Sequence, residues 1–339
     1  MLVENVGGYM SFNFFNVLNK DDKEVIHSAF IKYLLDNFGD FFYSKLFNLD
    51  FSDFNKAQLE KSYDKKRFDI QIISNDESKI IVIENKFKSF PLKEQLVNYD
   101  NLLVKHHKDK VQFKYLLSFD PKLISFSTNN WKVISYNKIL NSIESFLATV
   151  TDLTNDHKIF IQHYYESLAK YCSEYKMKLS NMTLVFKDKI DNEDKFWLRL
   201  ILFAIRNKLQ RAFNELDIKV KFVVNPGNTS VPLLNIIPIH WFNNGAEHLI
   251  QFQGTEIKFY IHSTNKDEII SLIKYSKKVV NSDRFAFKKI TKRKERSSYI
   301  FKENITKIIV NNISLDYLIS YLLNFYKIAD EVLTKYNTD

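Results

Sequence analysis

The first apolar runs of the chain are short, and their spacing predicts the strands of one sheet. Each run is rich in Ile, Val, Phe or Tyr and ends at polar residues, which is typical of β-strands. The run Ile80–Ile83 is apolar on both faces, which indicates a central strand covered on both sides. The predicted strands cover residues 57–63, 67–73, 80–86, 114–119 and 131–136.

Apolar residues at helical spacing flank these runs. A stripe that repeats every three to four residues predicts a helix over 21–38, with Gly39 at its end. Pro91 stands at the start of a helix predicted over 92–103, and further helices are expected from 137 and over 155–171. Strands and helices in this order predict an α/β fold, with a mixed central sheet flanked by helices.

Charged and weakly patterned residues at 173–195 mark a boundary between two domains. We divide the chain into an N-terminal domain, 1–180, and a C-terminal domain, 181–339. The second domain is expected to be α+β, with a turn at 225–228. Its predicted helices and strands cover residues 196–216, 219–224, 233–239, 248–252, 257–262, 268–281 and 315–336.

The turn between the second and third predicted strands decides which acidic side chains meet. If residues 75–78 form a four-residue loop, Asp69 lies directly opposite Glu84. A five-residue loop would send Asp69 to the other face of the sheet. Glu84 and Lys86 point the same way in either register, because side chains alternate along a strand.

Composition indicates a globular, basic protein. The chain has 339 residues, of which 45% are hydrophobic and 26% charged, and its formal net charge of +9 favours polyanionic partners. Cys172 is the only cysteine, which excludes an internal disulfide and a cysteine-based zinc site, so we expect a reducing compartment. With no signal peptide and no apolar run of membrane-spanning length, we expect a soluble, cytoplasmic protein with no membrane partner.

Asp69, Glu84 and Lys86 are the candidate catalytic residues. Mg²⁺ in proteins prefers oxygen ligands, commonly one or two carboxylates with water and substrate phosphate. Asp69 and Glu84 can supply the carboxylates, and the backbone carbonyl of Asn85 can supply a third oxygen. Lys86 is placed to hold an attacking water or to neutralise a phosphate. Two buried carboxylates repel each other, so this group should bind a metal or have a carboxyl with a raised pKa.

The same residues resemble the PD-(D/E)xK nuclease superfamily. Asp69 matches the lone acid, and Glu84-Asn85-Lys86 matches the acid-x-Lys element. Gln95 and Tyr99 resemble the Gln-x-x-x-Tyr element of the branch that includes RecB-type nucleases, and they lie four apart on one face of a predicted helix. The resemblance covers about residues 20–145, and the C-terminal half resembles no family that we can name.

The resemblance implies a restriction-endonuclease-like core and a metal-dependent nuclease that hydrolyses phosphodiester bonds. Mg²⁺ is the implied cofactor, with Mn²⁺ as a substitute. Gln95 and Tyr99 would line the site beside the nucleic acid backbone. DNA is the expected substrate, with RNA as an alternative. Related proteins occur in restriction and phage defence, which suggests an antiviral role, and a homodimer or an operon-encoded partner would fit such a role.

The leading helix carries two further candidate metal ligands, Glu24 and His27. The resemblance implies that a histidine on this helix can be a metal ligand, as in RecB-like nucleases. It also implies an acid on a core helix, for which Glu24 and Glu60 are both candidates. Asp21 and Glu24 match a capping box as well, which would account for Glu24 without catalysis. A lone helical histidine is more often packed than ligating.

Basic residues near the site and in one C-terminal run are candidate nucleic-acid contacts. Arg67 and Lys88 adjoin the predicted catalytic strands, although Arg67 can equally pair with Glu60 or Asp64. Lys292 and Arg293 belong to the densest basic run of the chain, which can either contact phosphates or form a solvated loop.

Several histidines carry no recognisable ligand spacing. His106 and His107 are interpreted as surface residues. His240, His248 and His262, near predicted strand ends of the second domain, are interpreted as structural or exposed.

Two other interpretations belong to different classes of protein. One is a non-catalytic nucleic-acid-binding protein that keeps the nuclease fold, although such a protein would not need Asp69, Glu84 and Lys86 together. The other is a structural or interaction protein whose match is accidental, and a register with Asp69 and Glu84 on opposite faces would favour it. Metal binding separates the first of these from the nuclease.

Overall fold

A computed structural model gives the fold of the chain, which divides into two compact units, Met1–Glu174 and Tyr175–Asp339. The division falls inside one long helix, α6 (Asn155–Ser180), which continues past its predicted end at 171. The structure describes residues 12–18, 23–87, 89, 92–121, 124, 126, 128, 130–186, 192–224, 231–242, 246–263, 265–289, 297–309, 311 and 313–338.

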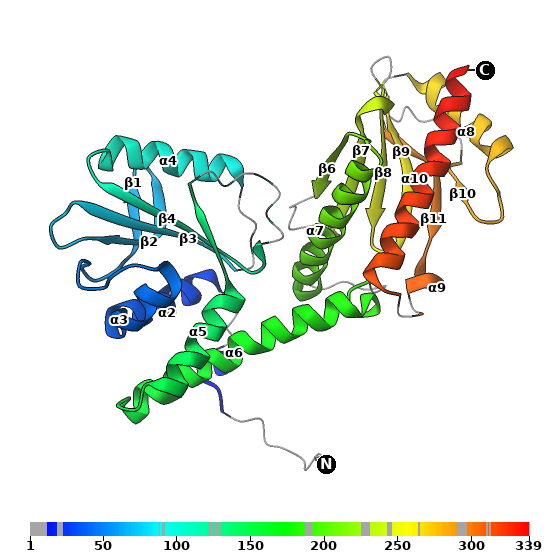
Figure 1. The fold of residues 1–339 in the computed structure, drawn as a ribbon. Coiled ribbons are helices and arrows are strands. Elements are labelled where there is room, and N and C mark those ends of the chain that lie inside the picture. Colours follow the sequence, from blue (N-terminus) through cyan, green and yellow to red (C-terminus); the bar gives the residue numbers. More distant parts are fainter. Residues whose placement is uncertain are drawn as a thin grey trace, which may run out of the picture. The chain divides into compact units, whose positions relative to one another are not determined.

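The N-terminal unit is built from a mixed sheet with helices on both faces. Its elements are α1 (Phe14–Val17), α2 (Glu24–Asn37), α3 (Gly39–Phe42), a π-helix η1 (Tyr43–Phe47), β1 (Gln58–Tyr63), β2 (Lys66–Ile73), β3 (Lys79–Lys86), α4 (Lys93–His107), β4 (Val111–Ser118), β5 (Lys132–Ser135), α5 (Tyr136–Thr149) and α6. The strand order is β1-β2-β3-β4-β5, with β1, β2 and β3 antiparallel and β4 and β5 parallel to β3. Helix α4 lies on one face of the sheet, and α2 and α3 lie on the other (Figure 1). The predicted mixed sheet flanked by helices is confirmed.

The β2–β3 hairpin has the four-residue loop that places the two acids at one position. The Ser74 N–H donates to the Lys79 carbonyl at 3.0 Å, and the strands pair from Ile73 opposite Ile80 to Ile70 opposite Ile83. The Ile70–Ile83 pair is the last one in this ladder, and the next pair in the same register would be Asp69 opposite Glu84. The predicted register is therefore confirmed, and the two strands separate at the candidate site.

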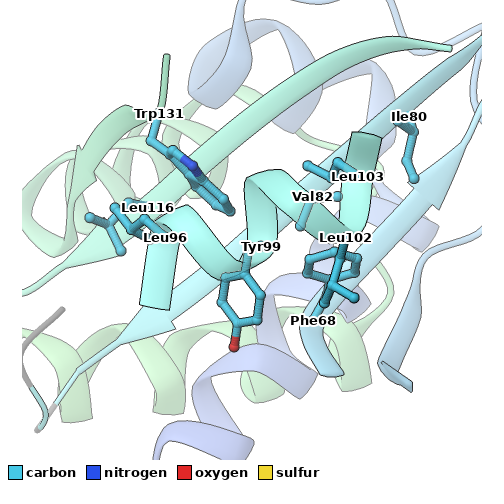
Figure 2. Close-up of a cluster of buried hydrophobic side chains, with 9 residues drawn as sticks. All are labelled: Phe68, Ile80, Val82, Leu96, Tyr99, Leu102, Leu103, Leu116 and Trp131. Atoms are coloured by element: carbon cyan, nitrogen blue, oxygen red, sulfur yellow. The ribbon is translucent and has the colours of Figure 1, made fainter. Parts of the chain in front are cut away.

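A buried apolar cluster fixes α4 on β3. Figure 2 shows its side chains, which come from β2, β3, α4, β4 and the residue before β5. The Tyr99 ring lies in this cluster, whereas its hydroxyl points away from it (Figure 2). Burial of such side chains stabilises by roughly 1.5–3 kcal/mol each, so the cluster holds the polar residues of α4 over the end of β3. The cluster consists of Phe68, Ile80, Val82, Leu96, Tyr99, Leu102, Leu103, Leu116 and Trp131.

The C-terminal unit contains a six-stranded antiparallel sheet. Its elements after α6 are a 3₁₀-helix η3 (Met182–Leu184), α7 (Asn192–Glu215), β6 (Val220–Val224), β7 (Leu233–Pro238), a 3₁₀-helix η4 (Ile239–Trp241), β8 (Glu247–Gln253), β9 (Glu256–His262), α8 (Lys266–Val279), β10 (Ala286–Phe287), β11 (Ser297–Asn304), α9 (Thr306–Ile309) and α10 (Leu315–Thr338). The strand order is β10-β11-β9-β8-β7-β6. Helices α7 and α10 pack together against the sheet (Figure 1).

The sequence did not predict β10 and β11. In β11 the apolar residues Ile300 and Phe301 are adjacent, so the apolar–polar alternation that identifies a strand is broken. A register shift between Tyr299 and Phe301 accommodates them in the strand. The turn predicted at 225–228 lies outside the described residues. No helix in the described part of the chain is both long and apolar enough to cross a bilayer.

Candidate active site

Three consecutive residues, Glu84, Asn85 and Lys86, end the most buried strand of the N-terminal unit. β3 lies between β2 and β4, and its residues from Ile80 to Asn85 are all buried. Glu84 is 1% exposed and Asn85 is fully buried. A carboxyl and a carboxamide at this depth are unfavourable unless other groups satisfy them, so their contacts define the site.

One oxygen of Glu84 is occupied and the other is not. Oε1 accepts hydrogen bonds from the Lys86 ammonium at 2.5 Å and from Gln95 Nε2 at 2.7 Å. Oε2 is buried and has no hydrogen-bond donor among the described residues. Burial, and then the charge of Asp69, raise the pKa of Glu84 to about 7, against the opposing effect of Lys86. Glu84 is therefore a buried carboxyl beside a second acid, and the ammonium of Lys86 offsets only part of the effect of burial and of Asp69 on its pKa.

Asp69 lies where the strands on both of its sides stop pairing with it. Its Oδ2 accepts a hydrogen bond from the Asn85 N–H at 2.6 Å. Glu60, at the corresponding position of β1, has a φ of 50° and interrupts the pairing between β1 and β2. Non-glycine residues in this left-handed region are strained, and such strain is frequent at functional sites. Burial raises the pKa of Asp69, although the Asn85 N–H and Lys86 oppose this effect.

Lys86 is held inside the site by the acidic groups. Burial lowers the pKa of the Lys86 ammonium, whereas the nearby Glu84, Glu24 and Asp69 raise it. The acidic groups outweigh burial, so the pKa lies above its ordinary value. Its side chain is only 12% exposed. Lys86 therefore carries a positive charge at neutral pH and can donate hydrogen bonds.

The side chain of Asn85 connects the strand to two helices. Its Nδ2 donates to the Glu24 carbonyl at 3.0 Å and to Ser28 Oγ at 2.9 Å, and its Oδ1 accepts from the Tyr136 hydroxyl at 2.5 Å. Sequence reasoning missed Ser28 and Tyr136. The spacing of Ser28, four residues after Glu24 and thus on the same side of the helix, is the one available signal.

Gln95 and Tyr99 meet Glu84 from α4. Gln95 Nε2 donates to both Glu84 Oε1 and the Tyr99 hydroxyl, the latter at 3.0 Å. The predicted placement of both residues on one helix face, beside the acid-x-Lys strand, agrees with the structure. Burial raises the pKa of Tyr99, and the Glu84 carboxylate raises it further, so this hydroxyl stays protonated.

Glu24 is explained by a contact other than the predicted capping box. α2 begins at Glu24, with Lys23 as its N-cap and no side-chain cap, so Glu24 is the first residue of the helix and the capping-box interpretation is wrong. Asp21 lies outside the described residues. Glu24 Oε1 accepts hydrogen bonds from the Ser89 N–H at 2.9 Å and the Ser89 hydroxyl at 2.7 Å, which ties the helix to the segment after β3.

His27 is packed among aromatic rings. It is 2% exposed, and its ring centroid is 3.7 Å from that of Phe87. Its Nδ1 lies 2.8 Å from the Tyr164 hydroxyl. These contacts pack the His27 ring between Phe87 and Tyr164, and its role as a metal ligand stays a prediction.

A cavity of about 250 Å³ opens beside Asp69. Its lining includes Glu24, Ser28, Glu60 and Arg67. Arg67 Nη1 is 3.3 Å from Glu60 Oε2, so one of the two predicted acidic partners of Arg67 is present. The other candidate nucleic-acid contacts, Lys88, Lys292 and Arg293, lie outside the described residues.

The structure shows the burial and contacts of three further histidines, His106, His107 and His248. His107 is buried at 8% exposure, so the expectation of a surface residue is wrong. It packs against Tyr63 because α4 is held close to the β1–β2 hairpin. His106 lies 3.0 Å from Asp64 at the surface. His248 is buried, with Nδ1 3.1 Å from the Trp241 carbonyl, which agrees with a structural role.

The donor set suits a hard divalent cation better than zinc. No group of three or more His, Cys, Asp or Glu side chains in the described part of the chain is arranged to hold a metal ion. Asp69 and Glu84 offer two carboxylates, the number that Mg²⁺ commonly takes from a protein. The bare Oε2 of Glu84 and the raised pKa values of both acids fit a site that a cation would complete.

Comparison with known proteins agrees with the geometry. Residues 40–166 match the model of a family described as the PD-(D/E)XK nuclease superfamily, and the match contains Asp69, Glu84, Lys86, Gln95 and Tyr99. Neither a curated protein nor a solved structure matches the chain. The sheet order, the acid-x-Lys strand and this match together lead to one assignment. The N-terminal unit of the chain belongs to the PD-(D/E)XK nuclease superfamily.

Proposed function

We propose that the protein is a divalent-metal-dependent nuclease that hydrolyses phosphodiester bonds of DNA. The observation that carries the proposal is the state of Glu84, a fully buried carboxyl with one oxygen on Lys86 and Gln95 and the other without a donor in the described residues. A carboxylate in this position is costly unless a cation completes its surroundings. The superfamily to which the unit belongs supplies the reaction class.

Asp69, Glu84 and the carbonyl of Asn85 are the proposed metal ligands. The Asn85 N–H already points at Asp69, and the N–H and C=O of one strand residue point to the same neighbouring strand. The carbonyl of Asn85 therefore belongs on the side of Asp69. Mg²⁺ is the proposed ion, with Mn²⁺ as a substitute. When bound, the ion would polarise the phosphate and lower the pKa of a bound water.

Lys86, Gln95 and Tyr99 have separate proposed roles. The Lys86 ammonium is protonated and placed to stabilise negative charge as it develops on the phosphate or to orient the attacking water. Gln95 holds Oε1 of Glu84 and, through Tyr99, is itself held on α4. These two residues fix the orientation of the acid, and their spacing agrees with the Gln-x-x-x-Tyr element of the RecB-like branch.

The wider assignments follow from the same proposal. Glu24 is an additional candidate ligand, since its carboxylate raises the pKa of Asp69 and lies at the same cavity. The proposed role is restriction or phage defence in the cytoplasm. DNA is the preferred candidate substrate, and RNA is the alternative. A homodimer or an operon-encoded partner would explain how the cell tolerates such an activity. Arg67, at the cavity beside Asp69, is the proposed phosphate contact.

Cleavage assays with matched variants test the proposal. Purified protein is incubated with plasmid, linear DNA and RNA in EDTA, Mg²⁺ or Mn²⁺, together with Asp69→Asn and Lys86→Ala. Glu77→Gln is the matched control, because this side chain is 82% exposed on the same hairpin. We expect metal-dependent DNA cleavage that both site variants lose and the control keeps.

Three results would count against the proposal. Cleavage that survives in both site variants would point to a different site. Cleavage in EDTA would exclude the metal. The third result is that no substrate is cut and that calorimetry detects no Mg²⁺ binding dependent on Asp69. The protein would then be a nucleic-acid-binding relative without catalysis.

A further inference from the structure

The net positive charge of the chain comes from its C-terminal unit. Residues 1–174 contain 22 Lys and Arg against 23 Asp and Glu, whereas residues 175–339 contain 27 against 17. The nuclease-type unit is therefore nearly neutral, and the unit without a recognised relative is strongly basic. An excess of this kind is the electrostatic signature of a polyanion-binding domain.

The two faces of the C-terminal sheet differ in chemistry. One row across four paired strands holds Ile236, Ile250, Phe259 and Phe301, each at most 1% exposed. This face packs on α10, since the ring centroids of Phe301 and Phe325 are 5.6 Å apart. The neighbouring row on the other face holds polar residues that are only partly buried: Asn235, Gln251, Lys258 and Lys302.

The polar row contains one pair of amides and one pair of ammonium groups that share a carboxylate. Gln251 Nε2 donates to Asn235 Oδ1 at 3.3 Å, and Lys258 Nζ is 3.1 Å from Glu256 Oε2. Lys302 also pairs with Glu256. Burial tends to raise the pKa of Glu256, but hydrogen bonds from both lysines lower it below its ordinary value. One carboxylate therefore serves two ammonium groups, which leaves a positive charge on the row.

Aromatic rings adjoin this row. Tyr299 of β11 lies directly opposite Tyr260 of β9 on the same face. The ammonium groups of Lys288 and Lys302 are 5.5 and 5.6 Å from the centre of the Tyr299 ring, within the range of cation–π attraction. We call the six residues the polar sheet face: Asn235, Gln251, Lys258, Tyr260, Tyr299 and Lys302.

A cavity lies at one edge of the polar sheet face. It has a volume of about 370 Å³, and Lys302, Asn304 and Arg284 contribute to its lining. The Arg284 guanidinium is held by Glu303 through two hydrogen bonds of 2.8 and 3.1 Å, so its orientation is fixed. The cavity is within the size range of small-ligand pockets, and its wall also carries the carboxylates of Glu256 and Asp283.

We propose that the polar sheet face binds a single-stranded segment of DNA. Lys258 and Lys302 would neutralise phosphates, and Tyr260 and Tyr299 would stack on bases, which is how sheets bind single strands without sequence preference. Asn235 and Gln251 supply the paired donors and acceptors that recognise base edges. The apolar residues on the same face, Ile237 and Leu249, are 3% and 1% exposed, so the face offers no apolar surface to a membrane.

This proposal goes beyond the proposed cleavage activity and does not depend on the metal site. Binding is measured with the full chain in EDTA, by fluorescence anisotropy of a labelled oligo(dT) strand and of a duplex. We expect Lys258→Gln/Lys302→Gln to weaken oligo(dT) binding at least tenfold. The slope of log affinity against log salt should fall by about 1.4, since each phosphate contact in a single strand contributes about 0.7.

Two further variants separate stacking and general charge. Tyr299→Leu keeps an apolar side chain but removes the ring, and we expect a loss of about 5- to 150-fold, as found for loss of one stacked base. Lys274→Gln/Lys277→Gln removes the same charge from an exposed side of α8, and it should leave binding within about twofold. Equal losses in the two double variants would overturn the proposal, because they would reflect net charge alone.

A measurement on the unaltered protein guards against misfolded variants. Iododeoxyuridine in the oligonucleotide is photo-crosslinked to the chain, and the adducts are located by mass spectrometry. Adducts at Tyr260 or Tyr299 are expected, whereas adducts confined to residues 1–174 would overturn the proposal. Asp69→Asn should lose cleavage and keep this crosslink. Loss of cleavage in every assay would refute the proposed function alone, and absence of oligo(dT) binding would refute this inference alone.

Discussion

Glu84 should make the metal-free protein less stable as the pH rises, and Glu84→Gln should remove this effect. The structure raises the pKa of this carboxyl to about 7 from an ordinary value of 4.5. Below pH 4.5 the carboxyl is protonated in both the folded and the unfolded chain. Between pH 4.5 and 7 the unfolded chain loses its proton first, so the free energy of unfolding decreases, and above pH 7 the loss is complete.

The expected size of this effect follows from the two pKa values. A difference of one pKa unit corresponds to about 1.4 kcal/mol, so the total loss is at most about 3.5 kcal/mol. Coupling to Asp69, which is itself buried and acidic, shares part of that energy between the two groups. Glutamine has nearly the same shape and no charge at any pH. The difference in unfolding free energy between parent and variant should therefore be constant in acid and should fall by roughly 1–3 kcal/mol by pH 8.

Urea unfolding in EDTA measures this difference for the correct unit. The chain has three tryptophans, Trp131 in the N-terminal unit and Trp197 and Trp241 in the C-terminal unit. In a background with Trp197→Phe and Trp241→Phe, fluorescence reports the buried Trp131 alone. Glu77→Gln removes a negative charge from an exposed position of the same hairpin and serves as the control.

Addition of Mg²⁺ gives the experiment a second result. If Asp69 and Glu84 hold the ion, excess Mg²⁺ at pH 8 should restore the stability of the parent by mass action and leave Glu84→Gln nearly unchanged. A difference between parent and variant that is flat from pH 4.5 to 8 would refute the reasoning, because the buried carboxyl would then ionise as easily as in water. Equal stabilisation of both proteins by Mg²⁺ would place the ion elsewhere.

Three further predictions concern the stability of the N-terminal unit in urea unfolding. Lys65→Gly should stabilise it by about 1 kcal/mol, because Lys65 has a φ of 64° in the tight β1–β2 turn; a destabilised variant would contradict the turn. Gly39→Ala should cost about 1–3 kcal/mol, because a Cβ there would come within 2.1 Å of the Phe51 ring, and a neutral result would show that the ring moves aside. Tyr136→Phe should cost about 1–3 kcal/mol, because it leaves Asn85 Oδ1 buried without its donor. It should also slow any metal-dependent cleavage. Unchanged stability would mean that this hydrogen bond adds nothing.

The fold and the acidic pair were predictable because both depend on local pattern. The apolar run of β3 and the four-residue loop after β2 together determine which residues lie opposite each other. A loop of one more residue would have reversed the result, so the prediction depended on Asn75–Ser78 alone. The spacing of Gln95 and Tyr99 likewise needed only the period of a helix.

The remaining parts of the site depend on contacts between residues far apart in the chain. Ser89 lies 65 residues from Glu24 and Tyr136 lies 51 residues from Asn85, and no periodicity relates such pairs. The separation of β2 and β3 beyond Ile70 is also invisible in the sequence, since Phe68 and Asp69 continue the pattern of the strand. The positive φ of Glu60, which interrupts the β1–β2 pairing at the same position, is likewise not signalled by the sequence pattern.

The middle residue of the acid-x-Lys element is therefore more constrained here than the motif suggests. Strand alternation turns its side chain away from Glu84 and Lys86, so the chemistry of the site makes no demand on it. The structure nevertheless buries Asn85 completely and gives its carboxamide three partners, on α2 and α5. Only a carboxamide of this length supplies two donors and an acceptor to those groups. Since its N–H also holds Asp69, Asn85 couples the position of the leading helix to the position of the catalytic acid. The site is thus set by the strand and both helices together.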